Sequence, residues 1–226
     1  MTAAAAPVIA IDGPAASGKG TIAKHVAQAL GFRYLDSGAL YRLVALKALQ
    51  TQTSLGDERA LEALASDLPV AFAGDIILLD GADASAAIRA EAVSEAASRV
   101  ATHTGVRSAL LSRQRAFRGE PGLVAEGRDM GTVVFPDAAL KVYVTASPEE
   151  RARRRYNQLI EKGNSVTLES LLLDIRERDA RDSTRATAPM KPAPGALILD
   201  TTDLTVDAAT AFVVDKYKAL ARPKRT

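Results

Sequence analysis

The sequence predicts an α/β fold in which a five-stranded parallel sheet is flanked by helices. Five short apolar runs have the length of buried strands, and most end at small or charged residues. The runs cover residues 8–11, 32–35, 123–125, 140–144 and 197–199. Segments with apolar residues at helical spacing lie between several of them, as in βαβ units. The apolar content of 47% comes mostly from Ala, Leu and Val, which suits helices packed on a buried sheet.

The stretch from residue 61 to residue 105 breaks this alternation. A helix around Leu61, Leu64 and Leu68 precedes two apolar runs, residues 70–73 and 76–79. The pair Gly74-Asp75 joins them and predicts a β-hairpin. A chain of 226 residues is enough for one α/β domain. We therefore expect a single domain over residues 1–226, with a small inserted subdomain at about 61–105.

Composition excludes several classes of protein. The absence of Cys excludes disulfides, thiolate catalysis and Cys-based zinc sites. No apolar run approaches the length of a membrane span. The first seven residues lack the basic start and apolar segment of a signal peptide, and we interpret them as a short disordered tail. We expect a monomeric, cytoplasmic protein that binds neither membranes nor nucleic acid.

The formal net charge is only +2, but arginine is dense between Arg99 and Arg185, with acidic residues interleaved. Such interleaving is typical of a solvated surface with salt bridges. It is also compatible with an arginine-lined pocket for polyanionic substrates. Composition alone leaves both interpretations open.

A glycine-rich loop directly follows the first predicted strand. It has the Gly-x4-Gly-Lys pattern of a phosphate-binding loop, with a helical pattern after it. In such a loop the backbone N–H groups surround the phosphates, and the lysine bridges them. This predicts a P-loop fold that binds ATP. The expected ATP-binding residues are Gly13, Pro14, Ala15, Ala16, Ser17, Gly18, Lys19, Gly20 and Thr21.

One position departs from the commonest form of the loop. Gly20 follows Lys19, whereas many P-loops place a Ser or Thr there to bind Mg²⁺. The hydroxyl is displaced to Thr21. We therefore expect Mg²⁺ to be held mainly by nucleotide oxygens and water, and we assign it no protein side chain. The Gly-Lys-Gly-Thr form resembles that of nucleoside-monophosphate kinases.

Three further blocks, at residues 35–42, 127–137 and 178–185, accompany the segment Ile11-Asp12-Gly13-Pro14. Together they resemble the bacterial cytidylate kinase family across essentially the whole chain, in the same order and with similar spacing. This resemblance implies transfer of the γ-phosphate of ATP to CMP or dCMP, with Mg²⁺. It also implies that the insertion is an NMP-binding subdomain.

The resemblance assigns acceptor-binding roles to residues that also have simpler interpretations. Asp36 and Ser37 are compatible with a helix cap, and Arg128 and Asp129 with a buried ion pair. Arg178, Asp182 and Arg185 are spaced i, i+4, i+7, so a continuing helix would place them on one face as a salt-bridge ladder. By resemblance, Ser37, Arg42 and Arg128 hold the acceptor phosphate, and Ser98, Arg107 and Asp129 read the base. Arg178 would approach the phosphates, and Asp182 and Arg185 the ribose or phosphate. The expected substrate-binding residues are Asp36, Ser37, Arg42, Ser98, Arg107, Arg128, Asp129, Arg178, Asp182 and Arg185.

Four arginines within five positions follow the predicted helix start Ser147-Pro148-Glu149-Glu150. They are Arg151, Arg153, Arg154 and Arg155, and they cannot share one helix face. The resemblance implies a lid at about residues 150–165, in which Arg154 or Arg155 closes over the donor phosphates. The expected catalytic residues are Lys19, Arg128, Arg178, Arg154 and Arg155. No general base is expected, because the acceptor phosphate oxygen is already anionic.

Two other functions remain compatible with the residues. The acceptor of a kinase could be UMP, another nucleotide or a shikimate-type acid. Alternatively, the arginine-rich half could belong to a P-loop module that binds nucleic acid. The low aromatic content of 4% speaks against that module, because base stacking needs aromatic side chains.

Overall fold

The chain divides into two compact units, each with its own buried core. The computed structural model describes residues 5–73, 76–161 and 163–221. The sheet unit combines Met1–Leu35 with Phe117–Thr226, and the helical unit is Asp36–Ala116. Residues 1–4 of the tail predicted over the first seven residues, and the turn predicted at Gly74-Asp75, lie outside the described residues. The prediction was wrong for the end of that tail, because Ala6 is buried and the Ala6 and Pro7 carbonyls accept hydrogen bonds from Arg118 and Leu123. The insertion at about 61–105 and the lid at about 150–165 stay predictions. No helix in the described ranges is long and apolar enough to cross a membrane.

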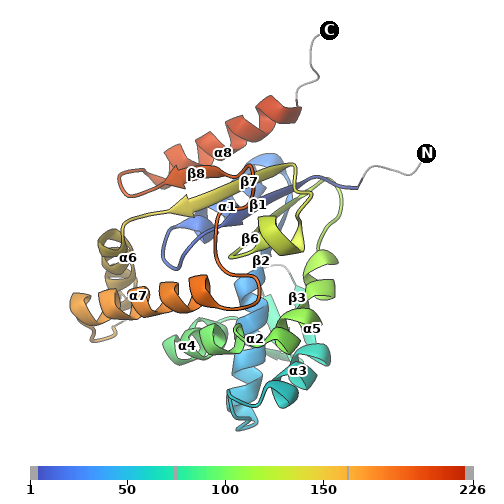
Figure 1. The fold of residues 1–226 in the computed structure, drawn as a ribbon, viewed down its shortest axis with the longest axis vertical. Coiled ribbons are helices and arrows are strands. Elements are labelled where there is room, and N and C mark those ends of the chain that lie inside the picture. Colours follow the sequence, from blue (N-terminus) through green and yellow to red (C-terminus); the bar gives the residue numbers. More distant parts are fainter. Residues whose placement is uncertain (1–4, 74–75, 162, 222–226) are drawn as a thin grey trace. The chain divides into compact units, whose positions relative to one another are not determined.

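The sheet unit is built on five strands in the order β2-β6-β1-β7-β8 (Figure 1). Their bounds are β1 (Val8–Asp12), β2 (Arg33–Asp36), β6 (Leu123–Gly127), β7 (Leu140–Thr145) and β8 (Leu197–Asp200). Strand β1 pairs in parallel with β6 on one side and β7 on the other, and β7 pairs in parallel with β8. The predicted five-stranded parallel sheet is therefore confirmed. Because every residue of β1 is buried, its run of apolar side chains is what a central strand requires.

Helices α1 (Lys19–Leu30) and α8 (Val206–Ala221) pack against each other and share one core cluster with the strands. Ile22 and Val26 of α1 and Val213 of α8 are buried in it. Gly31 ends α1 with a left-handed backbone (φ 65°), which confirms the predicted stop.

Helices α6 (Pro148–Glu161) and α7 (Leu168–Thr184) form a pair with a small apolar cluster of their own. The Ser147 hydroxyl accepts a hydrogen bond from the Glu150 N–H (3.2 Å), so the predicted cap is confirmed. Helix α7 ends at Thr184, and Arg185 follows it with an extended ψ of 142°. The helix that would have continued through Arg178, Asp182 and Arg185 therefore ends at Thr184, immediately before Arg185.

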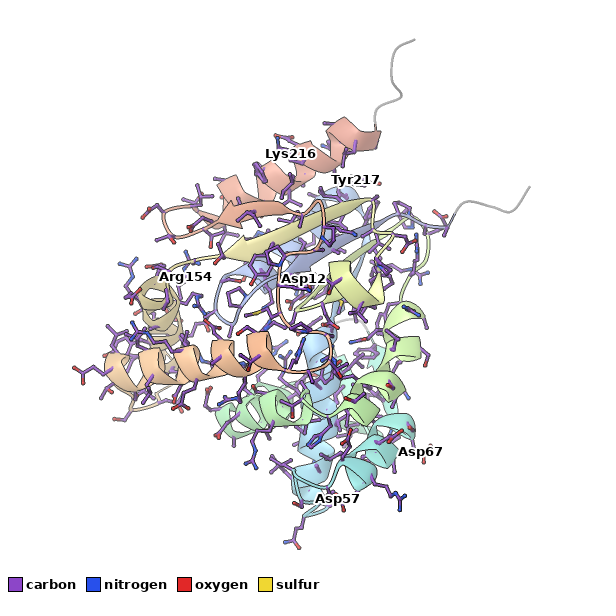
Figure 2. All side chains as sticks on the ribbon, in the orientation of Figure 1. Asp12, Asp57, Asp67, Arg154, Lys216 and Tyr217 are labelled. Carbon is purple, nitrogen blue, oxygen red and sulfur yellow. The ribbon has the colours of Figure 1, made fainter. Side chains whose placement is uncertain are left out.

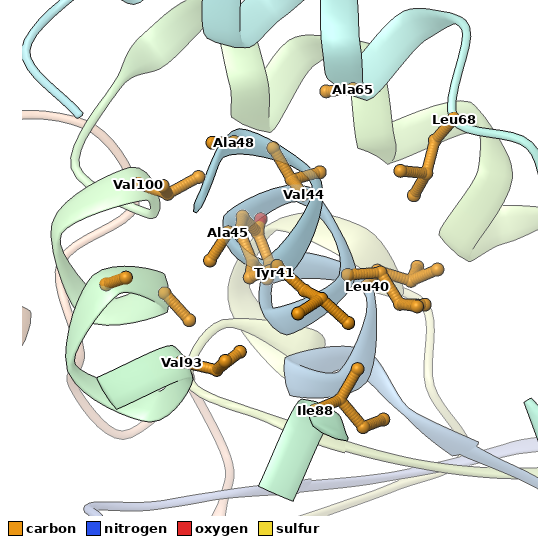
Figure 3. Close-up of a cluster of buried hydrophobic side chains, with 14 of the residues drawn as sticks. Leu40, Tyr41, Val44, Ala45, Ala48, Ala65, Leu68, Ile88, Val93 and Val100 are labelled. Carbon is orange, nitrogen blue, oxygen red and sulfur yellow. The ribbon is translucent and has the colours of Figure 1, made fainter. Parts of the chain in front are cut away.

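The helical unit is organised around α2, whose side chains are buried on several sides by the other elements of the unit (Figure 3). The elements are α2 (Ser37–Gln50), α3 (Glu58–Ser66), β3 (Val70–Ala73), β4 (Ile76–Leu79), β5 (Ala82–Asp83), η1 (Ala87–Arg89), α4 (Glu91–Val100) and α5 (Thr104–Arg115). Strands β3 and β4 are antiparallel, as the hairpin prediction requires, and β5 adds a third strand. Leu68 is buried, but it lies beyond the end of α3 rather than on that helix.

Candidate active site

The glycine-rich loop lies between the buried end of β1 and the first residue of α1. Gly18 precedes the helix in a left-handed conformation (φ 83°), and no side chain caps the helix N-terminus. The first N–H groups of α1 and its positive end are therefore directed at the loop, an arrangement that favours phosphate. Ala16 is also left-handed (φ 58°), which turns the backbone sharply inside the loop.

The loop is held from several sides within the sheet unit. A Cβ added to Gly13 (φ 152°) would lie 2.0 Å from the carbonyl oxygen of Val144, so only glycine fits where the loop leaves β1. The Thr201 hydroxyl donates a hydrogen bond to the Ser17 carbonyl (3.0 Å). Arg151 reaches the Ala15 carbonyl from α6 (3.3 Å). These contacts fix the backbone that would surround a phosphate chain.

Lys19 turns back across the loop. Its ammonium donates to the Pro14 carbonyl (3.4 Å) and lies 3.5 Å from a carboxylate oxygen of Glu126. Glu126 belongs to β6, two residues before Arg128. A Cβ added to Gly20 would lie 3.2 Å from the other carboxylate oxygen, so a Ser or Thr at this position would crowd Glu126. Glycine at position 20 therefore has a local steric reason, and Thr21 is exposed on the helix.

Two of the four clustered arginines reach the loop region. Arg154 donates to the Ser17 carbonyl (3.4 Å) and to both the hydroxyl (3.1 Å) and carbonyl (2.5 Å) of Thr201 (Figure 2). Arg151 is buried and forms a two-point ion pair with Asp179 of α7 (2.6 and 3.1 Å). Arg153 is exposed, and Arg155 is partly buried. Of the two arginines expected at the donor phosphates, Arg154 donates a hydrogen bond to the loop, at the Ser17 carbonyl.

An arginine-rich cluster surrounds Asp182 near the C-terminal end of α7. The Nε of Arg128 donates to Asp182 (2.8 Å), and a guanidinium nitrogen of Arg185 lies 4.0 Å from the other carboxylate oxygen. Burial alone would raise the pKa of Asp182, but Arg128, Arg178 and Arg185 lower it below its usual value. Three guanidinium groups thus act on one carboxylate, and guanidinium groups are also well suited to bind phosphate. The structure brings together four of the sequence-predicted residues here.

Asp12 ends β1 and is almost fully buried (Figure 2). Its two carboxylate oxygens accept hydrogen bonds from the N–H groups of Met130 and Gly131, each at 2.8 Å. Burial raises the pKa of Asp12 to about 7, because desolvation outweighs the two amide hydrogen bonds. Asp129, also buried, precedes the short π-helical turn η2 (Met130–Val134), but its side chain accepts no capping hydrogen bond from that turn.

In the helical unit, the predicted residues at the start of α2 form a compact group. Asp36 caps the helix by accepting from the Ala39 N–H (3.1 Å) and also pairs with Arg42 (2.5 Å). The cap predicted at Asp36 or Ser37 is thus formed by Asp36. The Nε of Arg42 is buried without a hydrogen-bond partner in the described residues. An unsatisfied buried donor of this kind is costly unless a ligand completes it.

Ser98 and Arg107 are both buried in the same unit. The Ser98 hydroxyl has no hydrogen-bond partner among the described residues. The Arg107 guanidinium lies over the Tyr41 ring (5.4 Å to the centroid) and donates to the Ala101 carbonyl (3.3 Å). The aromatic face stabilises the cation and restricts its position. Both residues therefore have the features of a preformed polar site.

Asp12, Glu126 and Arg151 were missed as functional residues by reasoning from the sequence. Asp12 and Glu126 are acidic residues at the ends of otherwise apolar strands, and that position was the available signal. Arg151 was indistinguishable from its neighbours, because spacing does not say which arginine faces the loop.

The fold and the loop define the class: a parallel sheet with a P-loop whose lysine begins the first helix is a P-loop kinase fold. The model of the cytidylate kinase family matches residues 9–219. The chain is 58% identical over 214 residues to a cytidylate kinase of Paraburkholderia phymatum, covering 95% of this chain and 94% of that protein. It is also 58% identical over 217 residues to a cytidylate kinase of Burkholderia multivorans, covering 96% and 95%. The chain belongs to the cytidylate kinase family, as the sequence resemblance implied.

Among solved structures, an uncharacterized protein of Eubacterium ventriosum aligns with a TM-score of 0.53 at 12% identity. The alignment covers 96% of this chain and 99% of that one. A likeness at this identity supports the fold alone.

The burial of Asp12 predicts a pH-dependent contribution to stability. The pKa of Asp12 is about 7 in the folded protein and 3.8 in the unfolded chain. Between these two pH values the folded protein keeps a proton on Asp12 that the unfolded chain has lost. Raising the pH from about 4 to 7 should therefore reduce the free energy of unfolding of the wild type relative to Asp12→Asn, by at most about 1.4 kcal/mol per pH unit. Urea denaturation of both proteins between pH 4 and 8 measures this difference. If the stability of the wild type relative to Asp12→Asn instead rose with pH, the amide hydrogen bonds would outweigh desolvation.

Proposed function

We propose that this chain transfers the γ-phosphate of ATP to CMP or dCMP, releasing ADP and CDP or dCDP. The observation that carries the proposal is the Lys19 loop at the N-terminus of α1, in a chain that belongs to the cytidylate kinase family. Family membership supports the acceptor, and the loop geometry supports the donor.

On the donor side, the loop amides and Lys19 bind the ATP phosphates. The Lys19 ammonium lies 3.5 Å from a carboxylate oxygen of Glu126. The same position suits a phosphate oxygen of ATP, which is also anionic. Arg154 lies beside the Ser17 carbonyl and adds a second cation to the donor side. These groups stabilise the negative charge on the phosphoryl group in transfer.

The acceptor assignments follow the resemblance to the cytidylate kinase family. We assign the phosphate of CMP to Ser37, Arg42 and Arg128, because guanidinium groups match phosphate oxygens. Arg178 supports the phosphates, and Asp182 and Arg185 the ribose or phosphate. We assign the cytosine base to Ser98, Arg107 and Asp129. A carboxylate accepts from the amino group of cytosine and repels the carbonyl that uracil has there.

The reaction needs no general base. An oxygen of the CMP phosphate is anionic at neutral pH and attacks the γ-phosphorus directly. The bond between that phosphorus and the bridging oxygen of ADP breaks, and the electron pair stays on ADP. The protein's part is to orient the two phosphates, stabilise charge and exclude water.

Mg²⁺ accompanies ATP in this proposal and neutralises charge on the phosphate oxygens. The described residues contain no group of three or more His, Cys, Asp or Glu arranged around one point. Mg²⁺ usually keeps several waters and phosphate ligands. We assign one carboxylate, Glu126, to Mg²⁺. Its Oε1 faces the space beside Gly20, 3.2 Å from the point where a Cβ on residue 20 would lie.

We further propose that the protein acts as a cytoplasmic monomer, since its substrates are small metabolites.

Acceptor choice is tested by measuring kcat/KM for CMP, dCMP, UMP, AMP and shikimate in a coupled assay for ADP. We expect CMP and dCMP to exceed UMP, because Asp129 repels the uracil carbonyl. Asp129→Asn should reduce the preference for CMP over UMP by about tenfold or more, the value of one charged hydrogen bond. Equal rates with CMP and UMP in the wild type would contradict the base-reading role.

The donor and acceptor assignments predict opposite kinetic effects. Lys19→Ala should lower kcat by at least about 100-fold while leaving the affinity for CMP nearly unchanged. Arg42→Ala should raise the KM for CMP about 10- to 100-fold, with little effect on the KM for ATP. Lys47→Ala is the matched control for Arg42, since Lys47 lies on the same helix and pairs with Asp80 instead. A large loss of CMP binding in Lys19→Ala would mean that the two sites are exchanged.

The role of Glu126 is tested by binding rather than by turnover. Glu126→Gln should weaken the affinity for MgATP several-fold. The same change should leave unchanged or strengthen the affinity for metal-free ATP, because it removes a negative charge beside Lys19. Titration with a fluorescent ATP analogue, with and without Mg²⁺, compares the two. Equal changes in the affinities for MgATP and for metal-free ATP would contradict the assignment of Glu126 to Mg²⁺.

A further inference from the structure

Asp12 connects the start of the phosphate loop to the segment that carries Arg128 and Asp129. It is the last residue of β1, and Gly13 begins the loop immediately after it. Its carboxylate accepts from the Met130 and Gly131 N–H groups, which lie 118 and 119 residues further along the chain. Each hydrogen bond uses a different carboxylate oxygen, so the pair fixes both the position and the orientation of this backbone.

The two amides held by Asp12 are the first N–H groups of η2. Groups at this position have no acceptor within their own turn and need one from elsewhere. Asp129 is the residue before the turn and does not cap it through its side chain. The carboxylate that completes the turn therefore comes from Asp12, and the Asp129 side chain is not used for this purpose.

The surroundings leave the segment little room to shift. A Cβ added to Gly131 would lie 3.4 Å from the Asp12 Oδ2, 3.2 Å from Ala193 and 3.3 Å from Lys141. Asp12 itself pairs in register with Gly127 of β6, the residue before Arg128. Arg128 and Asp129 therefore lie between two points that are both fixed to Asp12.

We infer that Asp12 is a positioning residue for CMP: by holding the Met130 and Gly131 amides, it sets the orientation of Arg128 and Asp129. The inference rests on the acceptor roles proposed above for those two residues. The phosphate loop has other supports, at Val144, Thr201 and Arg151. Losing the Asp12 hydrogen bonds should thus disturb the acceptor more than the donor.

Asp12→Asn tests this inference. Asparagine has nearly the same size but one carbonyl oxygen, so its NH₂ group faces one of the two amide donors. We expect the KM for CMP to rise about tenfold and the KM for ATP to change by less than about twofold. The preference for CMP over UMP should fall together with the affinity for CMP.

The matched control is Ile9→Ala, on the same strand. Ile9 is fully buried, and its hydrocarbon side chain cannot accept hydrogen bonds from the 130–131 amides, so its truncation lowers stability without removing those bonds. If Ile9→Ala lowers the melting temperature by a similar amount and raises the KM for CMP equally, Asp12 has only a structural role and the inference is overturned.

A second variant covers the case in which Asp12→Asn does not fold. Gly131→Ala places a methyl group 3.4 Å from the Asp12 Oδ2 and closer still to Ala193 and Lys141, so it presses on the same contact. It should also raise the KM for CMP with little effect on the KM for ATP. When Asp12→Asn and Gly131→Ala are combined, the KM for CMP should rise by less than the product of the two single increases. Independent, multiplying effects would contradict a shared contact.

Arg128→Ala separates this inference from the proposed acceptor roles. If Arg128→Ala leaves the KM for CMP unchanged, the acceptor assignment itself fails. If it raises that KM but Asp12→Asn and Gly131→Ala do not, only the positioning role of Asp12 fails.

Discussion

Parallel pairing of β1 with β6 and β7 is the constraint on which the site of the sheet unit depends. It aligns Asp12 with Gly127 on one side and with Tyr143 on the other. Strands β1 and β6 therefore end together, β7 runs on for two more residues to Thr145, and the residues that follow all three lie at one edge of the sheet. The phosphate loop follows β1, and the Arg128–Asp129 pair follows β6. A shift of one residue in either register would separate groups that the proposed function assigns to adjacent phosphates.

Several charged side chains at this edge of the sheet lie beside groups of opposite charge. Lys19 faces Glu126, Arg151 faces Asp179, and three arginines share Asp182. Nearby acids hold the pKa of Arg128 above its usual value despite burial, so it stays a cation. Such pairs keep long side chains ordered in a desolvated site, which reduces the entropy lost when a ligand binds.

Much of the donor site could be predicted from the sequence, because its residues are contiguous. The loop residues, Lys19 and the helix start follow from one short motif and its flanking patterns, and the five strands follow from apolar runs. The helix cap at Asp36 was also within reach, because caps depend on neighbouring residues. These features are local, and local physical chemistry determines them.

Contacts between distant segments were not predictable in the same way. The hydrogen bonds from Met130 and Gly131 to Asp12 exist only because β1 and β6 are neighbours in the sheet. The choice of Arg154 and Arg151 over Arg153 depends on how α6 is rotated, and the end of α7 before Arg185 depends on its packing. Acceptor roles were accessible only through resemblance to a family, because a buried serine such as Ser98 carries no motif of its own.

The supports described for the phosphate loop have a consequence for how such an enzyme can evolve. Val144, Thr201, Arg151, Arg154 and Glu126 all belong to the sheet unit. Ser98, Arg107 and Arg42 belong to the helical unit, whose core is separate. Substitutions in Asp36–Ala116 can therefore change the acceptor residues proposed in that unit while the loop keeps every one of these contacts. The acceptor residues proposed at Arg128 and Asp129 belong to the same unit as the loop, so substitutions there act on the part of the chain that also holds the phosphate donor.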